Sequence, residues 1–270
     1  MVLGAREMWN AKGGDEPAYW GLCFTAEQAA STVAMTAIGT PPSLSLEYSR
    51  DASSWDTFTP GTTEITLSNI GDKVYFKAGD DGNVSTGENQ TNAWEFTMTG
   101  AIAASGDISS LLDSGGTILD LTSHPYAFVR LFRDCSSLVA APTLPATTLG
   151  TCCYHTMFYS TGIAGAPELP AMNLATSCYY SMFRSCSRLT TAPLLSATTL
   201  VSSCYNSMFQ YCGSLAEIEV GFSSFGNTSS WVRNVSETGT FRCPTALGTN
   251  DTIRRGVSFC PAGWTVINTD

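Results

Sequence analysis

The chain has 270 residues, of which 43% are hydrophobic and 13% charged, and its formal net charge is −10. The length allows two domains. The 13 Lys and Arg residues form no basic cluster, so we expect no nucleic-acid binding, which needs grouped positive charge. No segment approaches 18 consecutive apolar residues, so we expect no membrane span, and the acidic surface would be repelled by anionic lipid.

Residues 1–21 form a polar leader that contains glycine. Charged residues such as Arg6, Glu7 and Lys12 stand where a signal peptide needs an apolar run. We interpret this leader as a segment that docks onto another subunit of a larger assembly. The initiator Met1 favours a chain that is not exported through such a signal, and the alternative is that a signal has been removed.

Short alternating strands separated by turn-forming residues follow in residues 22–100. The expected strands span residues 31–39, 43–50, 55–60, 64–70, 73–79 and 93–100. This rhythm predicts a small all-β sandwich. The Cys–Trp–Cys spacing of a true immunoglobulin domain is missing, so the expected domain is only immunoglobulin-like.

One loop of this region carries several oxygen-bearing side chains. Asp80, Asp81, Asn83 and Glu88 could together ligate calcium. Their order does not match an EF-hand, because Gly82 comes too early. We therefore expect a solvated turn, no metal site and no cofactor.

A pattern of about 26 residues recurs between residues 128 and 215. Its copies read AFVRLF, CCYHTMF, SCYYSMF and SCYNSMF, and Phe158, Phe183 and Phe209 are 25 and 26 residues apart. In a second recurring phrase, Pro142, Pro167 and Pro193 are each followed by a leucine two residues later. Such a period indicates stacked units that form a solenoid.

The residue spacing within one copy favours alternating local structures. Cys153, Tyr154, Met157 and Phe158 fall at i, i+1, i+4 and i+5, as on one face of a short helix. The proline-containing phrase is better interpreted as extended, with any strand very short or ending at the proline. The sequence thus predicts an α+β repeat solenoid with short strands and short helical turns.

We expect this solenoid to need covers at both ends, because one unit of about 26 residues cannot bury enough apolar surface to offset its ordering. The expected organisation is an N-terminal cap over residues 101–127 that begins with a helical turn at 107–116, the solenoid over 128–217, and a C-terminal cap over 218–270.

Positions that stay apolar or aromatic between copies are the expected interior. The expected core residues are Leu138, Leu144, Leu149, Tyr154, Met157, Phe158, Tyr179, Met182, Phe183, Leu189, Leu195, Leu200, Tyr205, Met208, Phe209 and Leu215.

Most of the ten cysteines occupy two repeat positions, at which other copies carry Ala127 or Thr161. A position that accepts alanine or threonine requires a small side chain, so we expect reduced, buried thiols. Two disulfides remain as alternatives, Cys178 with Cys204 and Cys243 with Cys260. Metal binding is disfavoured because the chain contains no CxxC pair.

No catalytic constellation is visible, so we do not expect an enzyme. The two histidines, His124 and His155, accompany no GxSxG, HExxH or phosphate-binding glycine loop. Since His155 stands at a variable repeat position, an exposed imidazole is favoured over a general base.

Recognition should reside at repeat positions that vary, because the invariant ones are used in packing. Exposed Tyr, Arg and His side chains suit contact with a glycan or protein. The alternative is that these side chains merely cover the convex side. The candidate binding residues are His155, Tyr159, Tyr180, Arg184 and Tyr211, with Glu168 on the other face.

The cadence CYxxMFxxCxxLxxAPxLPATxL resembles the BspA-like leucine-rich repeats of surface proteins from gut anaerobes and their phages. The C-terminal segments WVRNVSETGTFRCPTAL and PAGWTVINTD also resemble the endings of those proteins. Thr161, Ser196 and Met172 depart from the pattern. The resemblance implies a leucine-rich-repeat-like, noncatalytic recognition scaffold.

Two functional interpretations follow from this resemblance. In the first, the chain is a virion surface protein of a phage, either a capsid decoration, a head fibre or a tail fibre. Residues 1–100 would dock it, in several copies, onto other virion subunits, and the solenoid would contact a host-surface glycan or protein. In the second, it is a bacterial cell-surface adhesin whose export signal is missing.

Overall fold

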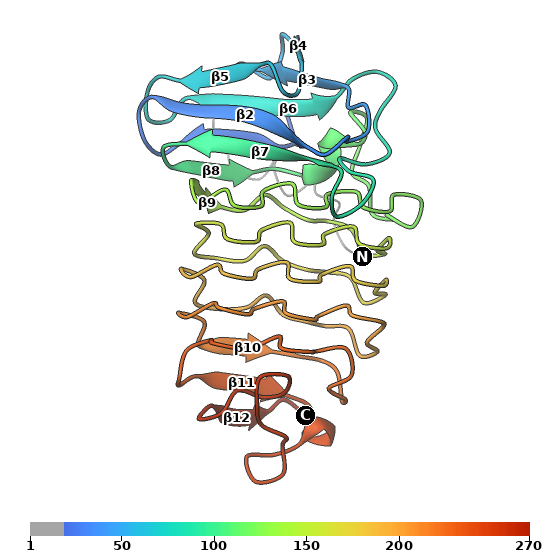
Figure 1. The fold of residues 1–270 in the computed structure, drawn as a ribbon, viewed down its shortest axis with the longest axis vertical. Helices are drawn as coiled ribbons and strands as arrows, with labels where there is room; N and C mark the ends of the chain where they lie inside the picture. Colours follow the sequence, from blue (N-terminus) through green and yellow to red (C-terminus); the bar gives the residue numbers. More distant parts are fainter. Residues whose placement is uncertain (1–18) are drawn as a thin grey trace.

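The computed structural model describes residues 19–270 (Figure 1). This part of the chain is mostly β, with twelve strands in three sheets, two short 3-10 helices and no α-helix. The expected α+β repeat solenoid with short helical turns is therefore wrong. Also within residues 19–270, no helix combines the length and the hydropathy that crossing a bilayer needs.

The N-terminal part contains eight strands and one 3-10 helix. These elements are β1 (Cys23–Ala26), β2 (Ser31–Ile38), β3 (Leu46–Ser49), β4 (Asp56–Phe58), β5 (Glu64–Leu67), β6 (Lys73–Ala78), β7 (Ala93–Thr99), β8 (Ile102–Ser105) and η1 (Ile108–Leu111). The six strands expected from the sequence correspond to β2 through β7, and η1 lies where a helical turn was expected. Sequence analysis missed β1 and β8.

The elements of the remaining chain are fewer and shorter. They are β9 (Leu138–Ala140), β10 (Glu217–Glu219), β11 (Thr240–Cys243), η2 (Thr245–Leu247) and β12 (Thr265–Asn268). Most of the chain between β9 and β10 consists of turns rather than strands.

Two sheets pack face to face in the N-terminal part. One has the order β5-β2-β7 and is antiparallel, and the other has the order β4-β3-β6-β1-β8-β9. The Phe24 and Phe76 rings of the larger sheet lie 5.0 and 5.5 Å from the ring of Phe96 on β7, in edge-to-face contacts. These rings form the centre of the core between the sheets.

The expectation of a separate immunoglobulin-like sandwich in front of the repeats also needs correction. Strand β9 belongs to the repeats, yet it pairs in parallel with β8 and completes the larger sheet, which is therefore mixed. The backbone N–H groups of Thr86 and Phe96 donate to the carbonyls of Ala127 and Leu131. The two sheets thus continue directly into the repeats and cover their first edge.

We call residues 126–217 the repeat stack, and the turn segments 126–135, 152–161, 177–186 and 203–212 its layers. Within each layer, alternate N–H groups donate to the carbonyl three residues earlier, as in overlapping β-turns. In the third layer these bonds run from Tyr180 to Ser177, Met182 to Tyr179 and Arg184 to Ser181.

The other half of the N–H groups connects one layer to the next. They point along the stack and donate to carbonyls of the following copy, at lengths of 2.8 to 3.2 Å between the third and fourth layers. The donors there are Tyr179, Ser181, Phe183 and Ser185, and the acceptors are Cys204, Asn206, Met208 and Gln210. Local turns and neighbouring layers together satisfy these backbone groups.

The turns are incompatible with the expected helical face because every fourth residue has a positive φ angle. In the third layer Ser177, Ser181 and Ser185 have φ of 54°, 51° and 63°. A right-handed helix excludes such values, and each costs a non-glycine residue roughly 1–2 kcal/mol. The layers therefore depend on their neighbours for stability, since one isolated layer would retain the strain without the ladder.

The aromatic positions of the repeats form two continuous columns. Phe132, Phe158, Phe183 and Phe209 stack with ring centroids 5.6 to 5.8 Å apart and interplanar angles of 8° or less. The ring of Phe96 extends this column into the N-terminal sheets. Phe128, Tyr154, Tyr179 and Tyr205 form the second column. All sixteen expected core residues are buried except Leu200, which is partly buried.

The proline-containing phrases are extended but hardly form strands. Strand β9 ends before Pro142, and later copies make only isolated bridges such as Thr148 with Asn173 and Thr191 with Glu217. This agrees with the expectation that proline shortens any ladder at this position.

The far end of the stack is covered by the parallel sheet β10-β11-β12 and by large aromatic side chains. Trp231 lies 6.1 Å from Phe209 at the end of the phenylalanine column, and its indole N–H donates to the carbonyl of Phe259. Trp264 is also buried and donates to the carbonyl of Ser236. The fourth layer thus donates its inter-layer hydrogen bonds to residues 227–233, where Trp231 stands in place of the next phenylalanine.

The expected docking leader lies almost wholly outside the described residues. Only its last residues are described, and there the Tyr19 hydroxyl donates to the carbonyl of Phe76 while its ring packs 5.0 Å from Trp55.

All ten cysteines are buried, and none forms a disulfide, so neither alternative pair is present. The thiols of Cys186 and Cys212 donate to the carbonyls of Phe158 and Phe183, each in the preceding layer. Burial raises the pKa of Cys186 to about 11. These thiols act as small core side chains that add a bond between layers.

A pair of substitutions at Ser185 distinguishes turns from a helix. Because φ is +63° there, Ser185→Gly should change the free energy of unfolding by less than about 0.5 kcal/mol, whereas Ser185→Val should lower it by about 1–2 kcal/mol. In a helix the order would be reversed, since glycine is the poorer helix former. Urea unfolding of both variants measures the difference, and a less stable glycine variant would contradict the turn geometry.

The native thiols should be inert to a thiol-specific reagent at pH 8. The reactive species is the thiolate, and burial raises the pKa of the repeat cysteines. Mass spectrometry after a short exposure should find unmodified native protein and ten modified sites after denaturation. Fewer than ten sites in non-reduced, denatured protein would indicate a disulfide and contradict this structure.

Candidate recognition surface

The stacking of layers aligns the residues that follow the phenylalanine column. Arg133, Tyr159, Arg184 and Tyr211 form a row along the stack, which we call the Arg–Tyr stripe. The Arg133 guanidinium carbon lies 4.8 Å from the Tyr159 ring centroid, and that of Arg184 lies 5.6 Å from the same ring and 5.5 Å from the Tyr211 ring. These are cation–π contacts that hold four successive side chains in order.

One member of the stripe departs from the repeat register. Gln210 follows Phe209 as Arg184 follows Phe183, yet Gln210 is buried. Tyr211, one residue later, packs on Arg184 instead and is 41% exposed. Tyr211, rather than Gln210, is thus the outward residue of this variable pair, as the choice of Tyr211 as a candidate binding residue requires.

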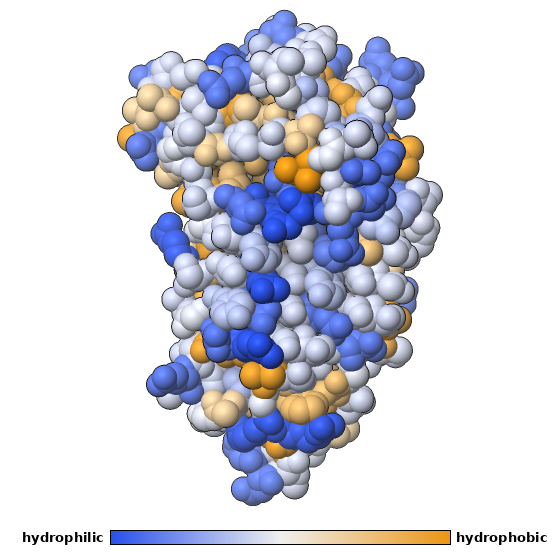
Figure 2. Space-filling view, in the orientation of Figure 1, coloured by the Kyte–Doolittle hydropathy of each residue, from blue (hydrophilic) through white to orange (hydrophobic). Residues whose placement is uncertain are grey.

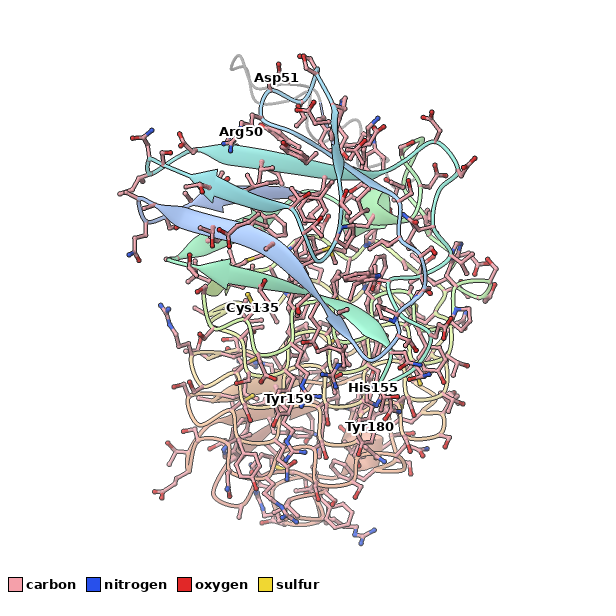
Figure 3. The ribbon with its side chains drawn as sticks, turned by 45° about the horizontal axis from the view of Figure 1, so that its top comes forward. Arg50, Asp51, Cys135, His155, Tyr159 and Tyr180 are labelled. Atoms are coloured by element: carbon pink, nitrogen blue, oxygen red, sulfur yellow. The ribbon has the colours of Figure 1, made fainter. Side chains whose placement is uncertain are left out.

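A second, shorter row contains the expected ligand residue His155. Its imidazole stacks on the ring of Tyr180, with ring centroids 4.7 Å apart and an interplanar angle of 5°; both residues are labelled in Figure 3. The expectation of an exposed imidazole is wrong, because His155 is only 5% exposed. Burial lowers its pKa to about 4, and the Arg130 and Arg133 charges act in the same direction. A neutral, buried ring of this kind packs rather than binds.

Glu168 is the expected binding residue that stands apart. It is exposed between Pro167 and Leu169, in the extended part of the repeat. Among the described residues, no contact connects it to the Arg–Tyr stripe. The structure therefore brings together Tyr159, Arg184 and Tyr211, places His155 and Tyr180 beside them, and separates Glu168.

Two further arginines contribute positive charge to this side: Arg133, which the sequence places at the variable offset of Tyr159 and Arg184 but which was not among the candidate binding residues, and Arg130, which was missed. Arg130 Nε donates to Glu95 Oε1 on β7 at 2.6 Å, and its guanidinium also donates to the Gln90 carbonyl. Arg133 Nε pairs with Asp134 at 3.1 Å.

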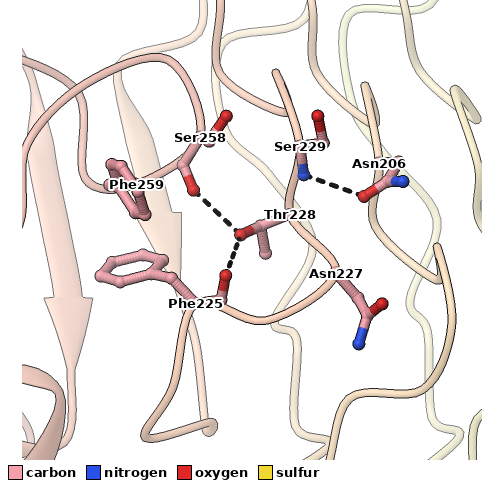
Figure 4. A pocket seen from close by; sticks show the side chains of 7 residues that line it. All are labelled: Asn206, Phe225, Asn227, Thr228, Ser229, Ser258 and Phe259. Atoms are coloured by element: carbon pink, nitrogen blue, oxygen red, sulfur yellow. Dashed lines mark hydrogen bonds between the residues drawn. The ribbon is translucent and has the colours of Figure 1, made fainter.

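A hollow of about 350 Å³ lies near the C-terminal end of the stack (Figure 4). The Thr228 hydroxyl lies 2.9 Å from the Phe225 and Ser258 carbonyls, and Asn206 accepts the Ser229 N–H at 2.8 Å. The seven lining residues carry no ionisable side chain, so they supply no general acid or base. They are Asn206, Phe225, Asn227, Thr228, Ser229, Ser258 and Phe259.

The loop considered for calcium uses its amide for structure. Asn83 accepts the Ser45 N–H at 2.9 Å and donates to the carbonyls of Ser45 and Leu111 at 2.8 Å. Within residues 19–270, no group of three or more His, Cys, Asp or Glu side chains is placed to hold a metal ion.

The face of the molecule drawn in Figure 2 is mixed rather than apolar. Figure 2 shows mostly hydrophilic and neutral side chains on one face of the molecule, with hydrophobic ones in small separate groups. No protein-family model, curated protein or solved structure matches the chain.

Replacing His155 should remove a pH-dependent loss of stability. Its pKa is about 4 in the fold and 6.5 for an unperturbed histidine, so the unfolded chain binds the proton first as pH falls. Stability from this residue is complete above pH 6.5 and declines between pH 6.5 and 4, by on the order of 3 kcal/mol. The change to compare is His155→Asn, because Asn206 occupies this position in the fourth layer.

Urea unfolding of both proteins from pH 4 to 7.5 measures this effect. The wild-type chain should lose stability faster than the variant below pH 6.5. A constant difference between the two proteins across this window would contradict the buried, neutral imidazole.

Proposed function

We propose that this chain is a noncatalytic recognition protein whose repeat stack binds a glycan or protein on a bacterial surface. The observation that carries the proposal is the Arg–Tyr stripe. Its side chains are ordered by cation–π contacts on four successive layers, and Tyr211 presents 41% of its surface to solvent. Ordered aromatic and guanidinium groups lose little conformational entropy on binding, which makes them effective contact residues.

The chemistry of the other candidate sites supports binding over catalysis. His155 is buried and packed on Tyr180, so it is unable to exchange protons with a substrate near neutral pH. The hollow lined by Phe225 and Thr228 lacks an ionisable group.

We extend the proposal to a virion surface protein of a phage that infects a gut bacterium. This step rests on the resemblance of the repeats to BspA-like proteins and their phage-encoded counterparts. Residues 1–100 would dock onto other virion subunits in several copies. The shape of the molecule supports this division, since the N-terminal sheets lie at one end and leave the sides of the repeats uncovered (Figure 1).

Attachment to bacterial cells tests the recognition proposal. The variant Tyr159→Ser/Tyr180→Ser/Tyr211→Ser removes the aromatic side chains of this face, whereas Glu168→Ala/Leu194→Ala alters exposed residues of the extended segments. Fluorescently labelled protein should bind gut anaerobes of the susceptible kind. We expect the tyrosine variant to attach at least tenfold more weakly, which is a loss of about 1.4 kcal/mol of binding free energy. The control should lose little.

Thermal unfolding of both variants shows whether the fold is retained. Unchanged attachment by a folded tyrosine variant would contradict the proposal. An equal loss in the control would assign attachment to another surface.

A further inference from the structure

Arg184 is the member of the stripe whose charge is unmatched. In the described part of the chain, its guanidinium makes no ion pair or hydrogen bond, and its Nε is buried without a partner. An arginine has five N–H donors and no acceptor, so leaving a buried donor unpaired is unfavourable. A ligand that accepts these hydrogen bonds would remove that cost.

The neighbouring rings fix where such a ligand can approach. Tyr159 and Tyr211 lie on either side of the Arg184 guanidinium, at 5.6 and 5.5 Å from its central carbon. Tyr159 itself lies between Arg133 and Arg184. Both faces of the Tyr159 ring are therefore occupied by arginines, and Arg184 covers one face of Tyr211, so ring edges, hydroxyls and guanidinium donors make up most of the surface left for a ligand. This favours acceptor-rich anionic groups over sugar rings stacked on an aromatic face.

The two arginines of the stripe lie two layers apart along the stack. Arg133 and Arg184 lie on the first and third layers, and the Tyr211 N–H donates to the carbonyl of Arg233 in the next copy. Neighbouring hydrogen-bonded chains lie about 4.8 Å apart, so equivalent side chains two layers apart are separated by about 9.6 Å. Asp134 partly neutralises Arg133, which leaves Arg184 as the strongest single position.

This spacing distinguishes between classes of linear anion. Side chains on one face of an extended peptide recur every 6.5 to 7 Å or so, which does not match the arginines. Duplex phosphates recur at about 3.4 Å along each strand, which is much closer than the two-layer separation of the arginines. In a polysaccharide with one acidic group in each two-sugar unit, the distance between successive acidic groups is close to the distance between side chains two layers apart.

We propose that the Arg–Tyr stripe binds a linear acidic polysaccharide that runs along the stack and carries one carboxylate or sulfate per two-sugar repeat. The inference rests on the proposed recognition function and names its ligand class. Arg184 forms charge-assisted hydrogen bonds with one acidic group, and Arg133 with the next group along the polymer.

Calorimetric titration with hyaluronan oligosaccharides tests this ligand class, because this polymer carries one carboxylate per disaccharide. Neutral dextran and poly-glutamate of similar length are the comparison ligands. Arg184→Gln should weaken hyaluronan binding at least tenfold, and Arg184→Lys should weaken it less because the charge is retained without the planar fork. The matched control is Arg188→Gln, an exposed arginine outside the stripe. Added salt should also weaken binding.

Several results would overturn the inference. One is that the wild-type protein does not bind hyaluronan, and another is that the wild type and folded Arg184→Gln bind it with equal affinity. A third is that poly-glutamate binds more tightly than hyaluronan, which would indicate that the ligand is an acidic protein segment. If no polysaccharide binds but the tyrosine variant still loses cell attachment, the inference fails and the recognition function stands. If hyaluronan binds through Arg184 but attachment is independent of the tyrosines, the recognition function fails instead.

Discussion

The architecture depends on how each repeat divides its backbone hydrogen bonds. Half of the N–H groups in a layer close local turns, and the other half donate along the stack. This division requires a positive φ at every fourth residue, as at Thr156, Ser181 and Ser207. The backbone strain of these positive φ angles is tolerated because each layer forms a hydrogen-bond ladder and stacked aromatic rings with its neighbour. One copy alone would have the strain and neither compensation.

The same constraint explains the two ends of the molecule. An uncovered last layer would leave a row of unpaired backbone groups and the face of a phenylalanine ring exposed. At one end β7 and β9 connect the first layer to the N-terminal sheets, and Phe96 extends the ring column. At the other end Trp231 and the parallel sheet β10-β11-β12 close the stack. Both ends are therefore part of the same continuous core.

Sequence reasoning located the repeats, their interior residues and six N-terminal strands, because these follow from periodicity and alternation. It wrongly assigned helical turns, since the spacing of Tyr154 and Phe158 is the same for a helical face and for consecutive four-residue turns. Serine and threonine give little warning of positive φ, which glycine usually marks. Its error at His155 has a related cause: variability between copies suggested exposure, whereas the ring packs flat on Tyr180. The pairing of β8 with β9 joins distant segments and has no local signal.

The recognition surface follows from this backbone, because only stacked layers place Tyr159 between Arg133 and Arg184. Residue-resolved amide hydrogen exchange of the native protein tests the central claim most directly. We expect the N–H groups of Tyr179, Ser181, Phe183 and Ser185, which donate between layers, to be as strongly protected as the N–H groups of the β2–β7 ladder. Protection confined to the local turn donors Tyr180, Met182 and Arg184, with rapid exchange of the alternate residues, would contradict the stacked-turn structure.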